Sequence, residues 1–438
     1  MMKEVTYEKI VLAFIIILSG LLMGITVHST QETDLMAGSY DINGYSIAYY
    51  ENDKIMFQNY GDGINEKSVF ELASNGKVLS AYIALKLVDE GKLNLEDKIA
   101  SFLDSDLLTN DERLYDITLK QLLCHTSGFS ASFELGIDKK IYSNPGEKFC
   151  YSGVGYIYLQ NVIESVSGMT MEQAAKYYVF EPLGMKNSTF EHIRTVTPYM
   201  NLSSVVIYIF TVFIIVFIVL LLAVFVMRKI TRFQFFSYKI SLIVCFIIAG
   251  IVNTFFLFVL LSKVVFAFGI CFVFMGVSLF LTRKSTKIFY AIIPIEAILI
   301  LGLGFAMPVS IPVTNDIVAK APNCAYTLKS TSEDMSIFCQ ELIEEYYSSD
   351  GTVKEMFSAA VNIDAVNSWG LGIAIESESK GETYWHSGIN PGFQSLFVLY
   401  PLQNKYVIIL TNSDNGLLFS KEIAKDFLEI DGNWDIKR

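Results

Sequence analysis

Four long apolar runs lie close together in the middle of this chain, at residues 205–227, 240–261, 264–281 and 288–307. Each is close to the ~20 residues that an α-helix needs to cross a bilayer. The alternative is a set of buried core helices, but the runs have no amphipathic face and almost no charge between their ends. The mean hydropathy of the chain, +0.42, is also high for an ordinary soluble protein. We therefore expect four transmembrane helices.

The basic residues between these runs predict their orientation. Residues 228–239 carry four Lys or Arg residues and residues 283–287 carry three, and loops of this kind stay on the cytoplasmic side. Four crossings return the chain to the side that it left. We therefore expect residues 28–204 and 308–438 to lie on the same extracytoplasmic face, where they can form one domain.

A fifth apolar run, residues 10–27, follows Lys3 and Lys9. It is typical of a signal peptide or a signal anchor. Because no small-residue cleavage site follows it, we favour an uncleaved anchor. The predicted protein is a multi-pass protein of the cell membrane, and it consists of an anchor (1–27), a first half-domain (28–204), four transmembrane helices (205–307) and a second half-domain (308–438).

The two outer sections have different secondary-structure patterns at their ends and in their middle. Apolar alternation and turn residues predict a hairpin at 44–60 and later strands at 369–375, 383–386, 394–400 and 405–410. Helical spacing predicts helices from Ser74 to Gly91 and at 119–124, 155–166, 334–347 and 421–428. This order predicts an α+β fold, in which both ends of the chain build one sheet and a helical lobe lies between them.

Ser74 and Lys77 are the first candidates for chemistry. A serine hydroxyl needs a base to become a good nucleophile, and residues i and i+3 share one face of a helix. If Ser74 begins the helix, free backbone N–H groups can also stabilise an oxyanion there. Ser377 and Lys380 have the same spacing in a polar stretch that we expect to be a loop. The tetrapeptide alone is therefore weak evidence.

Several longer motifs surround Ser74 in a consistent order. They are 117–128 with Leu-Leu-Cys-His-Thr-Ser-Gly, 145–153 with Tyr151-Ser-Gly, 181–185 with Pro-Leu-Gly-Met, 369–372, and His386-Ser-Gly. In these motifs the chain resembles the serine beta-lactamase and penicillin-binding protein superfamily, especially its class C beta-lactamase-like hydrolases and esterases. The resemblance implies an antiparallel sheet flanked by helices and an all-α lobe, with the active site between them.

The same resemblance implies a role for each matching residue. Ser74 is the nucleophile, Lys77 accepts its proton, and Tyr151 shares the general-base role and later protonates the leaving group. His386 contacts the substrate or Tyr151. The backbone N–H groups of Ser74 and Ile389 form the oxyanion hole, whereas substrate-binding positions are Ser387, Gly388 and Gly153. Simpler alternatives are a core role for Tyr151 and a strand-capping role for His386, and we expect His125 to be structural.

Two positions depart from the family pattern. Gly153 stands where the family usually has asparagine, and His386 replaces a lysine. Both changes favour an esterase or peptidase over an efficient beta-lactamase. We expect a membrane-bound, outward-facing serine hydrolase that acts on an ester, amide or D-amino-acid peptide. The alternatives are a beta-lactam sensor and a non-catalytic peptidoglycan-binding module.

The expected partners are the lipid bilayer and a small-molecule or peptide substrate, for which the cell wall is one candidate source. The net charge of −12 argues against nucleic acid. Six cysteines show no CxxC or Cys/His metal spacing, so we expect neither a metal nor another cofactor, and we favour free thiols outside the apolar runs.

Overall fold

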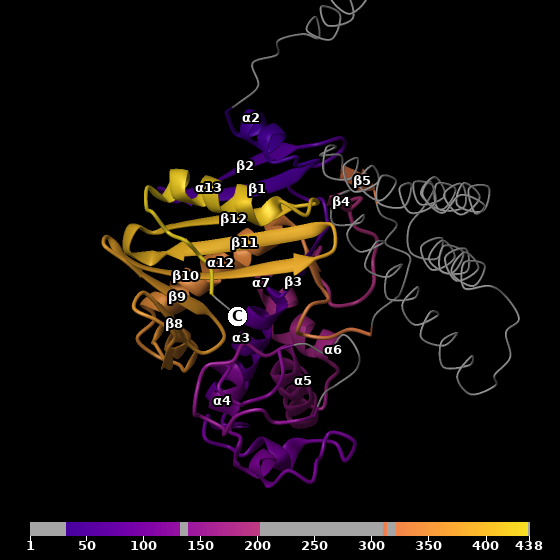
Figure 1. The fold of residues 1–438 in the computed structure, drawn as a ribbon, viewed down its shortest axis with the longest axis vertical. Helices are drawn as coiled ribbons and strands as arrows, with labels where there is room; N and C mark the ends of the chain where they lie inside the picture. The colour runs from indigo at the N-terminus through magenta and orange to yellow at the C-terminus, as the bar shows by residue number, and fades with distance from the viewer. Residues whose placement is uncertain (1–31, 132–138, 202–309, 313–320, 437–438) are drawn as a thin grey trace, which may run out of the picture.

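The computed structural model of the protein describes residues 32–131, 139–201, 310–312 and 321–436. Figure 1 shows a sheet above a helical lobe, with α3 (Gly76–Asp89) between them. The five apolar runs, including the predicted anchor, lie outside the described residues. Within the described ranges, no helix is both long and apolar enough to span a bilayer.

An eight-stranded antiparallel sheet forms the larger part of the fold, in the order β2-β1-β12-β11-β10-β9-β8-β7. Its strands are β1 (Tyr45–Glu51), β2 (Lys54–Tyr60), β7 (Val361–Asn362), β8 (Asn367–Trp369), β9 (Ala374–Glu378), β10 (Gly381–Asn390), β11 (Phe393–Tyr400) and β12 (Lys405–Thr411). β1 pairs directly with β12, so that Ile47 lies opposite Ile409. The first and last strands of the described chain are therefore neighbours within one sheet.

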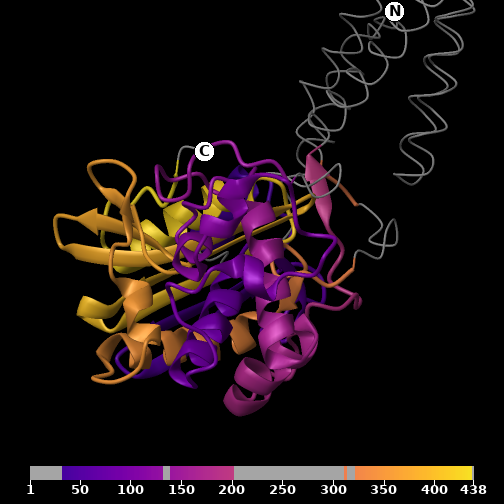
Figure 2. The same cartoon turned by 90° about the horizontal axis from the view of Figure 1, so that it is seen from below.

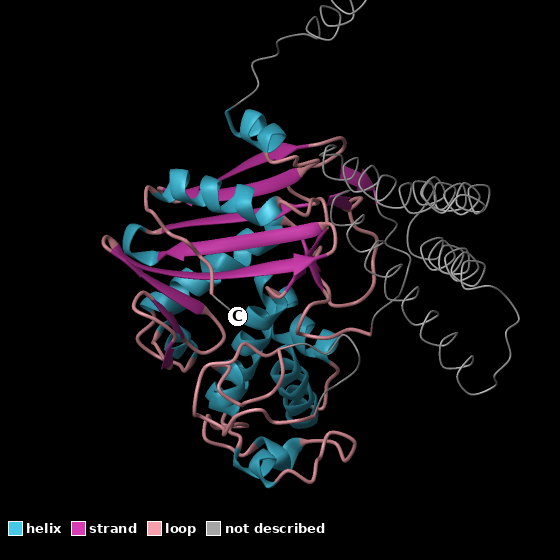
Figure 3. Cartoon of the chain, in the orientation of Figure 1, coloured by secondary structure: helices cyan, strands magenta, loops and turns pink. Residues whose placement is uncertain are grey.

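Helices cover both faces of this sheet (Figure 3). α12 (Ser332–Tyr347) packs against β1 and β12, whereas α13 (Gly416–Leu428) packs against β11, β12 and α2 (Glu32–Ser39). Seven of the eight residues of β11 are buried, as expected of a central strand with both faces covered. The short 3₁₀ helices η5 (Val353–Phe357) and η6 (Pro401–Gln403) lie in the connections.

The second part of the fold is the helical lobe, which lies in front of the sheet when the molecule is seen from below (Figure 2). α3 packs against α5 and α6, and α5 also packs against α4 and η1. The elements are η1 (Ile99–Phe102), η2 (Glu112–Asp116), α4 (Leu119–Leu123), α5 (Gly153–Ser167), α6 (Met171–Ala175), the π-helical turn η3 (Lys176–Phe180) and α7 (Glu181–Leu183). Thr118 and Ser152 cap the N-termini of α4 and α5, as short polar side chains commonly do.

Two small sheets join the sections that precede and follow residues 202–309. β3 (Phe70–Ala73) pairs with β6 (Leu328–Ser330), and β4 (Tyr199–Asn201) pairs with β5 (Ser310–Pro312). Because β4 and β5 flank 202–309 directly, the two ends of that segment lie side by side. The two outer sections thus contribute to one fold.

The predicted α+β arrangement is confirmed, as are the 44–60 hairpin and the end of α3 near Gly91, whose φ is +69°. Two predicted elements are wrong in detail. Residues 369–375 are not one strand, because Gly372, with φ +95°, forms part of a turn between β8 and β9. Ser377 lies in β9 rather than in a loop, and Lys380 lies in the β9–β10 hairpin.

At Gly388, the backbone of β10 lies in close contact with β3. A Cβ atom at this position would overlap the Leu72 carbonyl and lie 2.8 Å from the Ser395 hydroxyl oxygen. We predict that Gly388→Ala lowers the free energy of unfolding by about 1–3 kcal/mol, the usual cost of overpacking. Gly38→Ala is the control, because a Cβ there meets nothing within 4 Å. Urea unfolding measures both, and equal stability of the two variants would contradict this account of the contact.

Candidate active site

Ser74 lies in a tight turn between β3 and α3. Ala73 has φ +47°, a left-handed conformation that is strained for a residue with a Cβ atom. The sequence placed Ser74 in the first turn of the helix, but α3 begins at Gly76, two residues later. Asn75 fixes the turn, since its Nδ2 donates a 2.8 Å hydrogen bond to Ser395 in β11. The nucleophile candidate is half-buried and belongs to a strained strand-to-helix turn.

Lys77 lies in the first turn of α3 and is 2% exposed. Its Nζ atom is 3.1 Å from the Ser74 hydroxyl oxygen and 2.6 Å from the Ala325 carbonyl oxygen. Both partners are neutral oxygen atoms. A neutral amine can donate one N–H to the carbonyl and direct its lone pair at the serine hydroxyl. The geometry therefore suits proton transfer from Ser74 to Lys77.

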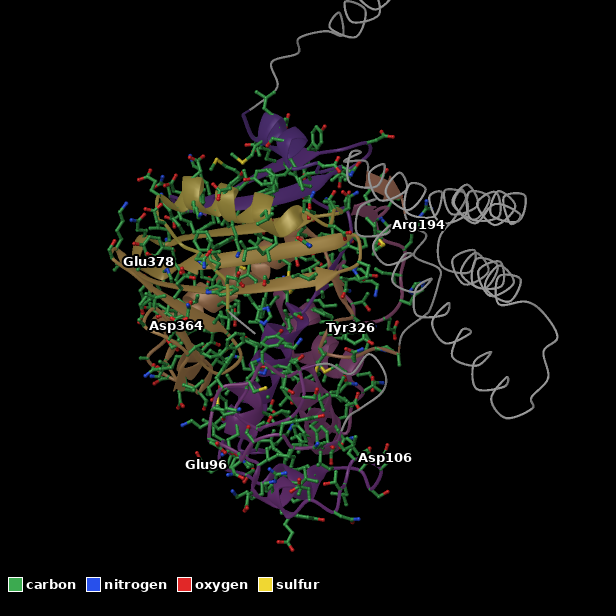
Figure 4. The ribbon with its side chains drawn as sticks, in the orientation of Figure 1. Glu96, Asp106, Arg194, Tyr326, Asp364 and Glu378 are labelled. Atoms are coloured by element: carbon green, nitrogen blue, oxygen red, sulfur yellow. The ribbon has the colours of Figure 1, made fainter. Side chains whose placement is uncertain are left out.

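The Ala325 carbonyl comes from a loop at 323–327, which the sequence did not identify as part of the site. Asn323 shapes this loop, because its Oδ1 accepts 3.1 Å hydrogen bonds from the N–H groups of Ala325 and Tyr326. Asn390 of β10 then donates to the Tyr326 carbonyl at 3.2 Å and to Glu71 of β3 at 2.7 Å. Tyr326 lies between the sheet and the lobe (Figure 4). Three separate segments of the chain are thus tied together beside Lys77.

Two tyrosine rings lie near the Lys77 amine. Nζ is 5.2 Å from the centre of the Tyr151 ring and 5.7 Å from that of Tyr156. Complete burial raises the pKa of Tyr156 well above its usual value, so this phenol stays protonated and cannot act as a base. Tyr151 is only partly buried and immediately precedes Ser152, the N-cap of α5. Tyr151 is therefore the better candidate of the two for proton transfer, and its catalytic role stays a prediction.

His386 lies on β10 and its ring centre is 6.2 Å from that of Tyr151. Its Nδ1 is 2.9 Å from the Ser387 carbonyl oxygen. A carbonyl can only accept a hydrogen bond, so Nδ1 carries a proton. In the neutral ring, Nε2 then has a lone pair that can accept a proton or a hydrogen bond from a hydroxyl group.

His125 has the opposite arrangement and is fully buried. Its Nδ1 accepts a 3.1 Å hydrogen bond from the Ser152 N–H group, and its ring packs 4.4 Å from the Tyr151 ring and 4.9 Å from the Trp369 ring, centre to centre. It therefore supports the segment that carries Tyr151. This is the structural position that the sequence predicted.

The remaining predicted positions lie on β10 and at the start of α5. Ser387 lines a pocket together with Tyr151 and His386, Gly388 is buried beneath it, and Ile389 is 48% exposed. Gly153 is buried, and its N–H donates to the Ala131 carbonyl at 3.0 Å. The predicted oxyanion and substrate-binding roles of these residues stay predictions.

No cluster of metal-ligating side chains occurs among the described residues. The four cysteines in this part of the chain, Cys124, Cys150, Cys324 and Cys339, form no disulfide. Burial raises the pKa of Cys324 to about 12. Its thiol therefore stays protonated near Lys77 and donates to the Tyr156 carbonyl at 2.9 Å.

Both the sequence and the fold of this chain are similar to those of known proteins. Residues 29–195 match the family described as Beta-lactamase. The chain is 31% identical over 186 residues to Protein flp of Staphylococcus aureus (strain MW2), a match that covers 36% of this chain and 37% of that protein. The chain thus spans well under half the length of this relative.

Two solved structures share the fold. One is a penicillin-binding protein from Bacillus halodurans, with a TM-score of 0.58, 15% identity and coverage of 91% of this chain and 99% of the other. The other is a D-stereospecific amidohydrolase from Streptomyces sp., with a TM-score of 0.57, 16% identity and coverage of 89% and 95%. The chain therefore shares its fold with a penicillin-binding protein and with an amidohydrolase. Its predicted place in the class C-like branch stays a prediction.

The structure generates a direct test of the role of His125. We predict that His125→Ala lowers the free energy of unfolding by about 2–4 kcal/mol, because it leaves a cavity among aromatic rings and an unpaired Ser152 N–H group. His192→Ala is the matched control, because His192 is exposed. Urea unfolding of the two variants measures the difference. A small effect of both substitutions would argue against a structural role for His125.

Proposed function

We propose that this protein is a membrane-bound serine hydrolase of the beta-lactamase-related group, with its catalytic domain on the outer side of the membrane. It hydrolyses an ester, an amide or a D-amino-acid peptide through an acyl-enzyme on Ser74. The observation that carries this proposal is the position of the Lys77 amine, 3.1 Å from the Ser74 hydroxyl and held at 2.6 Å by the Ala325 carbonyl.

The proposed reaction has two steps. The Ser74 oxygen attacks the substrate carbonyl while its proton passes to Lys77, and Tyr151 then protonates the leaving alcohol or amine as the scissile bond breaks. Water next attacks the acyl-enzyme and gives its proton to Tyr151, while Lys77 returns the serine proton to the Ser74 oxygen as the acyl bond breaks. A carboxylic acid and free Ser74 are released. The N–H groups of Ser74 and Ile389 hold the negative oxygen in both steps.

His386, whose ring lies near that of Tyr151, supports a choice of substrate class. It stands where many relatives have a lysine, so that an imidazole ring replaces a permanent cation. An anionic substrate group gains less from such a ring. The similarity to a D-stereospecific amidohydrolase supports an amide or peptide as strongly as an ester.

One observation favours a second candidate, a non-catalytic module that binds peptidoglycan. Gly153 provides no side-chain amide at the position where the family usually has asparagine, and its backbone N–H is already bonded to Ala131. Binding of peptidoglycan fragments by both the native protein and Ser74→Ala, without turnover by either, would support this candidate.

Labelling with a fluorescent fluorophosphonate tests the hydrolase proposal. We predict that the native protein is labelled, that Ser74→Ala is not, and that Lys77→Ala is labelled at least about 100-fold more slowly, the usual loss when a general base is removed. The matched control is Ser377→Ala with Lys380→Ala, which removes the other serine and lysine of the same spacing. Labelling of Ser74→Ala at the native rate would refute the proposal.

The proposed location has a separate test. A fluorophosphonate that cannot cross membranes should label Ser74 to the same extent in intact and in lysed cells, because the site faces outward. Ser74→Ala, expressed at the same level, gives the background. Labelling that requires lysis would place the site on the inner side and would contradict the orientation.

A further inference from the structure

The segment that follows α13 runs back across the sheet to the candidate active site. In Figure 1 it descends from the end of α13 toward the lower edge of β10. Asp435 and Ile436 at its end line the same pocket as Tyr151 and His386. The residues of this segment match none of the sequence motifs.

Trp434 anchors the segment firmly. It is fully buried, and its indole N–H donates a 3.1 Å hydrogen bond to Thr383 of β10. The carboxylate of Glu376 in β9 accepts from the backbone N–H groups of Asn433 at 2.6 Å and of Trp434 at 2.7 Å. Gly432 packs directly against the indole ring, where any Cβ atom would overlap it. These contacts fix the position of the two residues that follow.

The pocket that results is small, and its lining includes the carboxylate of Asp435. Its volume is about 30 Å³, and its lining residues are Tyr151, Trp369, Trp385, His386, Ser387, Asp435 and Ile436. A pocket of this size admits only a small group. Among the described residues that line it, Asp435 alone has a permanent charge, and its side chain is 62% exposed at 3.5 Å from Lys421.

We propose that Asp435 and Ile436 determine the substrate specificity of the Ser74 site. Ile436 restricts the size of the acyl group that the pocket accepts, and Asp435 favours substrates with a cationic amino group beside the scissile carbonyl over those with a carboxylate. This inference rests on the proposed hydrolase function and deepens it. It predicts that an amino-acyl ester or amide is preferred to a simple fatty ester.

The experiment compares p-nitrophenyl esters of glycine, acetate, butyrate and succinate as substrates. In Asp435→Asn, the ratio of kcat/KM for the glycine ester to that for the acetate ester should fall about two- to fivefold, the range for an exposed charge pair. The ratio for the succinate ester to the acetate ester should rise. Asp431→Asn is the matched control, because it removes an exposed carboxylate from the same segment outside the pocket lining.

In Ile436→Ala, the ratio of kcat/KM for butyrate to acetate should rise about tenfold, as expected when a hydrophobic pocket gains room for extra methylene groups. Leu418→Ala, at a position that is 59% exposed, is the control. Thermal melting of each variant shows whether it is folded.

The inference would be overturned if the kcat/KM ratios were unchanged in variants that are folded and labelled by fluorophosphonate. Equal changes of these ratios in the control variants would also overturn it. Failure of native Ser74 to react with fluorophosphonate would instead refute the proposed hydrolase, and the inference would fall with it.

Discussion

The Lys77 amine is the interaction on which the rest of the site depends. It contacts Ser74, three residues away, and Ala325, which lies beyond the apolar runs in the sequence. The contact with the Ser74 hydroxyl is local, because the two residues are only three positions apart. The Ala325 carbonyl, in contrast, can reach Lys77 only if the second section of the chain has folded back. The position of the candidate base therefore requires both sections. Because Lys77 is almost completely buried, loss of either partner would leave a costly polar group without compensation.

The sheet explains how the two sections come together. β1 and β12 pair near one side, β3 and β6 pair beside the nucleophile turn, and β4 and β5 pair at the ends of segment 202–309. Each pair combines one strand from before that segment with one from after it. An insertion between such neighbours is tolerated well, since its ends are already adjacent and closing a longer loop costs little more than closing a short one. The predicted transmembrane helices fit this arrangement, although they lie outside the described residues.

Much of the fold could be predicted from the sequence because it follows from local patterns. The 44–60 hairpin has alternating residues around Asn52 and Asp53, which adopt the positive φ values that such a turn requires. Ser74, Lys77, Tyr151 and His386 belong to motifs, and the structure brings all four together. Three other residues could not be predicted in this way. Ala325 contributes a backbone carbonyl, Asn323 shapes a loop through its side-chain amide, and Trp434 is a buried side chain that holds the C-terminal segment in place. Such roles depend on tertiary contacts and leave no periodic or motif pattern in one sequence. Gly372 was missed similarly, since a tight turn between two short strands looks like one strand.

The measurement that tests the central claim most directly is the pre-steady-state hydrolysis of a p-nitrophenyl ester, followed by mass spectrometry of the acid-quenched protein. The account predicts a burst of close to one p-nitrophenol per chain, with the acyl group on the peptide that contains Ser74. The burst should slow in Lys77→Ala and disappear in Ser74→Ala. Acylation of another residue, or a burst of native size in Ser74→Ala, would contradict the account.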